Sequence, residues 1–122
     1  MGKTVLLIED EPNIVEAIRF LLARDGWRVE THGRGDTALE AVHKHQPDLI
    51  VLDVMLPKRS GFDILRDLRA SQATRDLPVM MLTARGQTKD RELAEQYGVS
   101  RFMTKPFSNT DMIAAVRELA EA

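Results

Sequence analysis

The chain has 122 residues, which is the size of one ordinary domain with a substantial hydrophobic core. Its 43% hydrophobic and 30% charged residues exclude an intrinsically disordered chain, and the absence of cysteine excludes disulfides, thiol catalysis and cysteine-based zinc sites. A net charge of -2 provides no basic face for a phosphate backbone, so we expect no direct nucleic acid partner.

Five short apolar or β-favouring runs are expected to form strands. The first, third and fourth are almost continuously apolar, which is typical of strands covered by helices on both faces. The five runs cover residues 4–8, 28–32, 48–53, 78–82 and 100–104.

Helices are expected between these runs, because apolar residues there recur at helical spacing. Proline and glycine mark the ends of the first helix, and serine followed three residues later by aspartate marks the starts of the third and fifth. These signals are Pro12 and Gly26, Ser60 with Asp63, and Ser108 with Asp111. The second helix is expected at about 35–46 and the fourth at about 88–97.

Strand and helix alternate five times, which predicts an α/β fold with a parallel sheet between two layers of helices. Right-handed crossovers leave few topologies for such a sheet. For five strands we favour the doubly wound, flavodoxin-like order 2-1-3-4-5 with five helices. No linker, internal repeat or shift in composition divides the chain, so residues 1–122 are expected to form one domain.

Polar side chains end or follow four of the expected strands. They are Glu9 and Asp10, Asp53, Thr83, and Lys105. In a doubly wound sheet, ligands bind at the carboxyl ends of the strands, near the point where the strand order reverses. We therefore expect three acids, a hydroxyl and an ammonium to meet at one edge of the sheet.

Three neighbouring carboxylates repel one another unless a cation offsets their charge. Hard oxygen donors of this kind suit Mg²⁺, which binds a few carboxylates together with water and a phosphate. With the cation present, Asp53 can act as an oxygen nucleophile and accept a phosphoryl group. Lys105 and the Thr83 hydroxyl are then expected to hold the sides of that group that the metal does not reach.

Four runs of the sequence, taken together and in this order, carry a family resemblance. They are LLIEDEP, LIVLDVMLPKRSG, VMMLTARG and FMTKPF. Through them the chain resembles the receiver domain of bacterial two-component response regulators over essentially all 122 residues. The resemblance implies a phosphorylation-dependent switch that accepts a phosphoryl group on Asp53. It is not an enzyme in the usual sense, because it catalyses only its own phosphorylation and dephosphorylation.

Carried over by position, the resemblance makes Asp10 and Asp53 direct Mg²⁺ ligands. Glu9 is implied to act on the metal through water, and Met55 through its backbone carbonyl. Ala84 is small, which leaves room for the phosphate at its backbone N–H.

The same resemblance assigns the switch. Lys105 becomes the ion-pair partner of the phosphate, Thr83 the hydroxyl that moves toward it, and Phe102 the aromatic side chain that rotates in response. The surface around the fourth helix, fifth strand and fifth helix then changes for a partner. Pro106 is implied to follow a cis peptide bond, since X-Pro is the bond at which cis is least costly.

Three departures from the family pattern are visible. Glu9 stands where many receivers have aspartate, and its longer arm is expected to keep the metal. Lys58 and Arg59 follow a proline where small or neutral residues are frequent, and they either steer a phosphodonor or are simply solvated. Ser100 and Arg101 replace acids that are typical of receivers dimerising through their last two helices, so we expect a monomer or weak dimer.

The implied partners are a sensor histidine kinase or histidine phosphotransfer protein, and a downstream protein target or output domain. No apolar run approaches the roughly 18 residues of a membrane span, and the start MGKTVLLIED is too short and acidic for a signal peptide. We therefore expect a cytoplasmic location and no membrane partner. The histidines at 32, 43 and 45 are interpreted as surface side chains rather than phosphate carriers.

Three alternative functions are open to test. A flavodoxin-type electron carrier would share the fold, but EDEP after the first strand would repel a flavin phosphate. A haloacid-dehalogenase-type phosphatase also forms an aspartyl phosphate, but its Asp-x-Asp pattern after the first strand is missing. The third alternative is a receiver-shaped binding module that is never phosphorylated.

Overall fold

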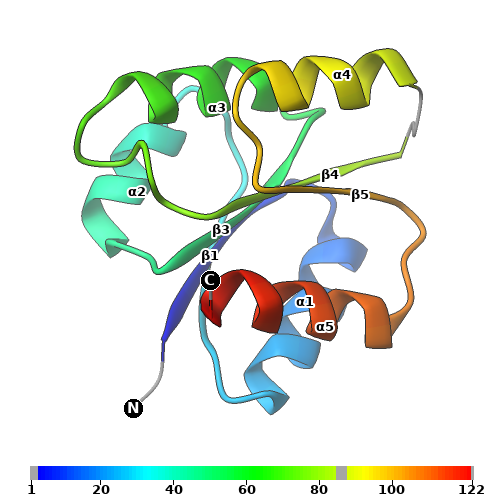
Figure 1. Ribbon diagram of the computed structural model, residues 1–122. Coiled ribbons are helices and arrows are strands. Elements are labelled where there is room, and N and C mark those ends of the chain that lie inside the picture. The colour runs from blue at the N-terminus through cyan, green and yellow to red at the C-terminus, as the bar shows by residue number, and fades with distance from the viewer. Residues whose placement is uncertain (1–2, 85–87, 122) are drawn as a thin grey trace.

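The computed structural model describes residues 3–84 and 88–121, in which five strands and five helices alternate along the chain (Figure 1). The strands are β1 (Thr4–Ile8), β2 (Arg28–His32), β3 (Leu49–Asp53), β4 (Val79–Thr83) and β5 (Arg101–Thr104). The helices are α1 (Pro12–Arg24), α2 (Ala38–His45), α3 (Gly61–Ala70), α4 (Thr88–Gln96) and α5 (Asn109–Glu121). The strands pair in parallel in the order β2-β1-β3-β4-β5, which confirms the predicted doubly wound sheet.

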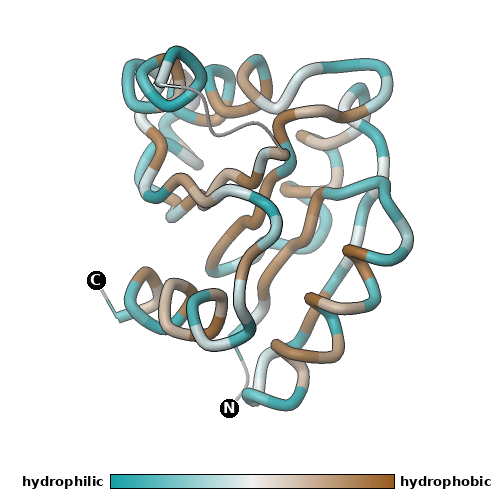
Figure 2. Tube along the Cα trace, turned by 90° about the vertical axis from the view of Figure 1, so that its right-hand side faces the viewer, coloured by the Kyte–Doolittle hydropathy of each residue, from teal (hydrophilic) through white to brown (hydrophobic). Residues whose placement is uncertain are grey.

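The helices form two layers, with α1 and α5 on one face of the sheet and α2, α3 and α4 on the other (Figure 1). Successive strand residues point to opposite faces. In β1, Leu6 and Ile8 pack beneath α2, α3 and α4, whereas Val5 and Leu7 pack against α1 and α5. All four are fully buried, which explains why every residue of the strand after Thr4 is apolar. Figure 2 shows the hydrophobic residues gathered along the strands and on the inward sides of the helices.

The edges of the sheet are less well covered than its centre. Strands β1, β3 and β4 are almost completely buried, whereas β2 and β5 are half-buried. Helix α4 is largely polar and buries only Ala94 among its described side chains. With so little apolar surface to lose, α4 is the helix that can move at the lowest cost.

The second helix begins at Ala38, later than the predicted start at about residue 35. The backbone N–H of Gly35 donates to the carbonyl of Pro57 at 3.0 Å. A Cβ at Gly35 would lie 2.3 Å from the carbonyl oxygen of Arg59, so only glycine allows this approach. The loop before α2 therefore packs on the loop before α3, a tertiary contact that delays the helix start.

The two predicted capping boxes differ in detail. The Ser108 hydroxyl accepts from the N–H of Asp111 at 3.0 Å, as predicted. The Ser60 hydroxyl instead accepts from the N–H of Phe62 at 3.1 Å and not from that of Asp63. A serine N-cap can accept a hydrogen bond from the N–H of either the second or the third helical residue. Ser60 therefore still caps α3, and the helix starts where it was predicted.

The remaining boundaries agree closely with the predictions. The strands and α4 begin and end within one residue of the predicted positions. No helix in the described part of the chain is both long enough and apolar enough to cross a membrane.

Candidate functional site

The parallel register brings the predicted polar residues to one edge of the sheet. Asp53 is the last residue of β3 and is aligned with Leu82 of β4, so Thr83 lies one residue beyond it. Thr83 is aligned with Thr104 of β5, and the N–H of Lys105 donates to the Thr83 carbonyl at 2.7 Å. Residues far apart in the sequence thereby meet at the carboxyl ends of the central strands.

Three carboxylates form the centre of this site. Oxygen atoms of Glu9, Asp10 and Asp53 all lie within 4.8 Å of one another. The Glu9 side chain is fully buried and that of Asp53 is 5% exposed, whereas Asp10 is exposed to solvent. Hard oxygen donors at this separation, open on one side to water, fit a small divalent cation such as Mg²⁺.

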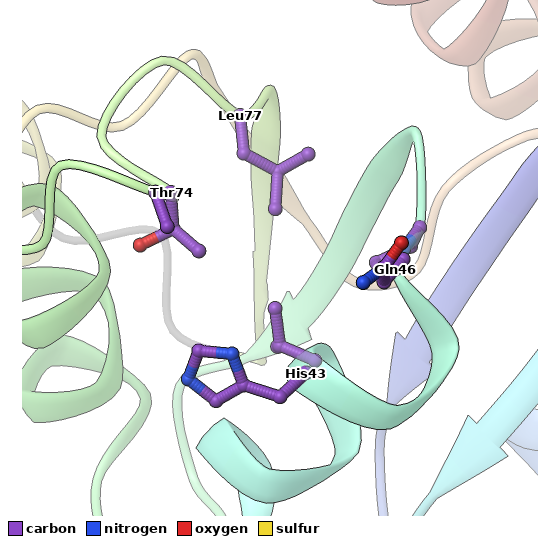
Figure 3. A pocket seen from close by; sticks show the side chains of 7 residues that line it. His43, Gln46, Thr74 and Leu77 are labelled. Atoms are coloured by element: carbon purple, nitrogen blue, oxygen red, sulfur yellow. The ribbon is translucent and has the colours of Figure 1, made fainter.

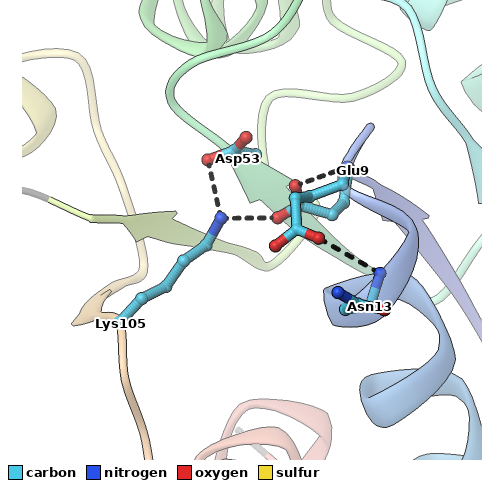
Figure 4. A network of polar contacts seen from close by, with 5 residues as sticks. Glu9, Asn13, Asp53 and Lys105 are labelled. Carbon is cyan, nitrogen blue, oxygen red and sulfur yellow. Dashed lines mark hydrogen bonds and ion pairs between the residues drawn. The ribbon is translucent and has the colours of Figure 1, made fainter.

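Lys105 reaches into the acid cluster from the end of β5 (Figure 4). Its ammonium nitrogen lies 2.8 Å from Oε1 of Glu9 and 3.4 Å from Oδ1 of Asp53. The other Glu9 oxygen accepts from the backbone N–H of Glu11 at 3.1 Å. In turn the Glu11 side chain caps α1 by accepting from the N–H of Asn13 at 3.2 Å.

The electrostatics of the cluster follow from burial and from crowded negative charge. Burial, together with the charge of Glu9, raises the pKa of Asp53 from 3.8 to about 6. Lys105 and a hydrogen bond from the Met55 backbone oppose this rise without cancelling it. Burial acts to lower the pKa of Lys105, but its contacts with Glu9 and Asp53 outweigh burial and raise it. One lysine therefore offsets only part of the repulsion among three acids.

The two predicted switch residues lie on the strands that follow β3 across the sheet. Thr83 is buried at the end of β4, and Phe102 is 9% exposed in β5. The guanidinium of Arg91 lies over the Phe102 ring, 5.0 Å from its centroid. Ala84 is exposed directly after β4, and the next residues of the run VMMLTARG, 85 and 86, lie outside the described residues.

The peptide bond between Lys105 and Pro106 is cis, as the resemblance implies. Lys105, whose side chain enters the acid cluster, is the residue directly after β5.

A wide groove opens beside Asp10, with a volume of about 770 Å³. The loop between β3 and α3 forms most of its wall, including the exposed side chain of Met55. The groove therefore gives a large molecule access from solvent to Asp10, the exposed member of the acid cluster.

A smaller pocket of about 250 Å³ lies elsewhere, between the end of α2 and the loop between α3 and β4 (Figure 3). His43 on its rim is exposed, as predicted. His32 and His45 are half-buried: Nε2 of His32 lies 2.6 Å from the Thr37 hydroxyl, and Nδ1 of His45 lies 4.0 Å from Oε1 of Glu30. No acid lines this pocket, and the acid cluster remains the candidate site.

The sequence model of the response regulator receiver domain matches residues 5–117. The chain belongs to the response regulator receiver domain family. It is a receiver domain of the kind found in two-component systems. The strand order of the sheet and the position of the acid cluster agree with this membership.

Among curated relatives, the receiver domain is 38% identical over 117 residues to the phosphate regulon transcriptional regulatory protein PhoB of Escherichia coli. That match covers 96% of this chain and 51% of PhoB. The chain spans about half the length of the curated relatives it matches.

Two solved structures are also similar to this receiver domain. The receiver domain of the sensor histidine kinase PA1611 from Pseudomonas aeruginosa has a TM-score of 0.91 and 29% identity, with both chains covered completely. That structure has a magnesium ion coordinated in its active site cleft. The BeF3-activated N-terminal receiver domain of Klebsiella pneumoniae RstA has a TM-score of 0.90 and 28% identity, covering 98% of this chain and 99% of that one.

Sequence reasoning missed two features of this receiver site. The partner nearest to Lys105 is Glu9, although the resemblance assigns the lysine to the phosphate on Asp53. The left-handed backbone of Lys58, with φ of 75°, was also not foreseen. The sequence carries no signal for the Lys105–Glu9 contact or for the backbone conformation of Lys58, because both depend on how loops and side chains pack in three dimensions.

Proposed function

We propose that the chain accepts a phosphoryl group on Asp53 from the phosphohistidine of a sensor histidine kinase or histidine phosphotransfer protein, with Mg²⁺ as cofactor. The observation that carries this proposal is the meeting of Glu9, Asp10, Asp53 and Lys105 at one edge of the sheet. Three acids without a metal would repel a phosphate, whereas the same acids with a divalent cation and a lysine can bind one.

Asp10 and Asp53 would hold the metal directly, with the Met55 backbone carbonyl as a further ligand and Glu9 acting through water. The carboxylate separations and the solvent-facing Asp10 support this assignment. When bound, Mg²⁺ supplies positive charge that neutralises the acids and the phosphoryl oxygens.

The chemical step forms one bond and breaks one. A carboxylate oxygen of Asp53 attacks the phosphorus, and the bond from phosphorus to the donor nitrogen breaks, leaving its electron pair on the imidazole. The product on this chain is an acyl phosphate. Lys105 then leaves Glu9 for a phosphoryl oxygen, while the Thr83 hydroxyl and the N–H of Ala84 hold other oxygens.

The added charge is the proposed signal. Phosphorylation adds about two negative charges at Asp53, which attract the Thr83 hydroxyl and vacate the space behind it. Phe102 rotates into that space, and the surface of α4, β5 and α5 changes. The weak packing of α4, with Ala94 as its buried residue, supports this as the element that moves.

Residues 1–122 form one receiver domain in this proposal, acting as a monomer or weak dimer in the cytoplasm. Its downstream partner is a separate protein or an output domain. The domain contacts no nucleic acid or membrane directly, and its catalysis is limited to its own phosphorylation and dephosphorylation. This excludes repeated turnover of small phosphate esters, the behaviour of a phosphatase.

The test is incubation with acetyl phosphate and Mg²⁺, followed by intact mass measurement. We expect one phosphoryl group on the wild type, none on Asp53→Asn and normal labelling of Asp111→Asn, an exposed acid on α5. Labelling of Asp53→Asn, or no labelling of the wild type, contradicts the proposal. Release of many equivalents of phosphate from small esters would favour the phosphatase.

A further inference from the structure

Lys58 has a backbone conformation that is unfavourable for a lysine. Its φ is 75°, in the left-handed region that L-residues with a Cβ adopt at a cost and glycine adopts freely. Among the described residues, the other non-glycine with positive φ is Gln46, which has an ordinary reason for it as the C-cap of α2. A residue that persists in such a conformation calls for a functional explanation.

The position of Lys58 supplies that explanation. It lies in the loop between β3 and α3, is exposed, and lines the groove of about 770 Å³ together with Asp10 of the acid cluster. Any molecule that approaches Asp53 through this groove passes an exposed lysine ammonium on a short loop.

Two other charged side chains that line the groove have ion-pair partners of their own. The Arg59 guanidinium pairs with Asp67, and the Asp63 carboxylate lies 3.6 Å from the guanidinium of Arg66. Within residues 3–84 and 88–121, Lys58 has no salt-bridge partner. The ammonium of Lys58 is therefore available to a ligand.

The carboxylate of Asp36, on the loop before α2, interacts with the charge of Lys58. That carboxylate is already held by the guanidinium of Arg34, at 2.6 and 3.0 Å. Arg34 is the larger cause of the lowered pKa of Asp36, and Lys58 is a smaller one.

A phosphodonor meets an electrostatic obstacle here. The donor is an anion, and the groove leads past Asp10 toward two further acids. A mobile cation at the mouth raises the local concentration of anions and speeds their encounter, and this effect falls as salt is added.

We propose that Lys58 is a specificity-determining residue that attracts strongly anionic phosphodonors into the groove beside Asp10. The inference rests on the proposed phosphorylation of Asp53, and Lys58 acts on the approach of the donor rather than on the transfer step. The strained backbone is retained because glycine, the better residue for this φ, carries no charge.

Three substitutions separate charge from strain. Lys58→Arg keeps the charge and the strain, Lys58→Ala removes the charge and keeps the strain, and Lys58→Gly removes both. Lys44→Ala removes one exposed positive charge from α2, away from the groove, and is the matched control for net charge.

The rate of labelling at saturating Mg²⁺ and low donor concentration is the first measurement. At low salt we expect Lys58→Ala and Lys58→Gly to be slower with dianionic acetyl phosphate by roughly 3- to 10-fold, with Lys58→Arg and Lys44→Ala near the wild type. The difference is expected to shrink with the less charged donor phosphoramidate and at high ionic strength.

The thermal midpoint is the second measurement. Lys58→Gly is expected to unfold at a higher temperature than the wild type, while Lys58→Ala and Lys58→Arg do not. If Lys58→Gly unfolds at a higher temperature than the wild type and is phosphorylated more slowly, the lysine contributes its charge at a cost in stability.

Equal labelling rates of Lys58→Gly and wild type at low salt overturn the inference, as does an equal loss in Lys58→Arg or Lys44→Ala. Failure of the wild type to be labelled at all would instead overturn the proposed function, so the two failures are distinguishable.

Discussion

The ammonium of Lys105 lies closer to Glu9 than to Asp53, at 2.8 Å against 3.4 Å. Glu9 offers this contact because its longer arm brings a fully buried carboxylate across the site, with its second oxygen held by the N–H of Glu11. Without a metal, the lysine is thus the cation that offsets part of the acidic charge.

Lys105→Met is expected to destabilise the metal-free protein by about 3 kcal/mol, because it leaves Glu9 and Asp53 buried without a countercharge. Added Mg²⁺ is expected to recover part of this loss. Urea denaturation with EDTA and with Mg²⁺ measures both effects. Lys44→Met, at an exposed position on α2, is the control, and an equal loss there would contradict the argument.

Asp53→Asn is expected to stabilise the metal-free protein at pH 7.5 by about 2 kcal/mol, because it removes a charge that burial and Glu9 disfavour. A carboxyl whose pKa rises on folding binds its proton more tightly in the folded state. Its ionisation therefore costs stability as the pH rises from 3.8 through about 6.

The advantage of Asp53→Asn over the wild type should consequently be smaller at pH 5 than at pH 7.5. Denaturation of both proteins in EDTA at the two pH values measures this difference. An advantage that is the same at both values would show that Asp53 is not the group responsible.

Mg²⁺ is expected to raise the thermal midpoint of the wild type, since a ligand that binds only the folded state stabilises it by roughly 3 kcal/mol at one hundred times its dissociation constant. Asp10→Asn should lose most of this shift, because it removes a solvent-facing member of the acid cluster. Asp111→Asn should keep it. Identical shifts in the two variants would place the metal elsewhere.

Gly61→Ala is expected to destabilise the domain by about 1 to 3 kcal/mol. A Cβ at Gly61 would lie 2.2 Å from the backbone carbonyl oxygen of Asp53, so the start of α3 would have to move away from the site. Gly33→Ala is the matched control, because its Cβ would find its nearest neighbour at an ordinary 3.8 Å. Thermal unfolding measures both, and equal midpoints would contradict the packing argument.

Trp27 fluorescence is expected to change little when Mg²⁺ binds. Trp27 directly precedes β2, at the amino ends of the strands, and packs, partly buried, against the core cluster under α1 and α5. The acid cluster lies at the opposite, carboxyl ends. Strong quenching by Mg²⁺ in the wild type that persists in Asp10→Asn would reveal a second metal site near the tryptophan.

The sequence by itself determined the alternation of strands and helices and the order of the sheet. The continuous apolar run of β1 is buried on both faces, and such runs separated by amphipathic helices admit few topologies. The same reasoning placed Glu9, Asp53 and Lys105 at one edge, because parallel strands share the direction of their carboxyl ends.

Only the tertiary structure decided which of these groups touch and how the loops around them fit. The preference of Lys105 for Glu9 depends on side-chain reach, and the contact of Gly35 with Arg59 depends on two loops that are distant in the sequence. The left-handed backbone of Lys58, in the loop between β3 and α3, is likewise visible only in the folded chain. Local patterns determine periodicity and burial, but contacts between distant segments depend on distances of an ångström or less, which exist only in the folded chain.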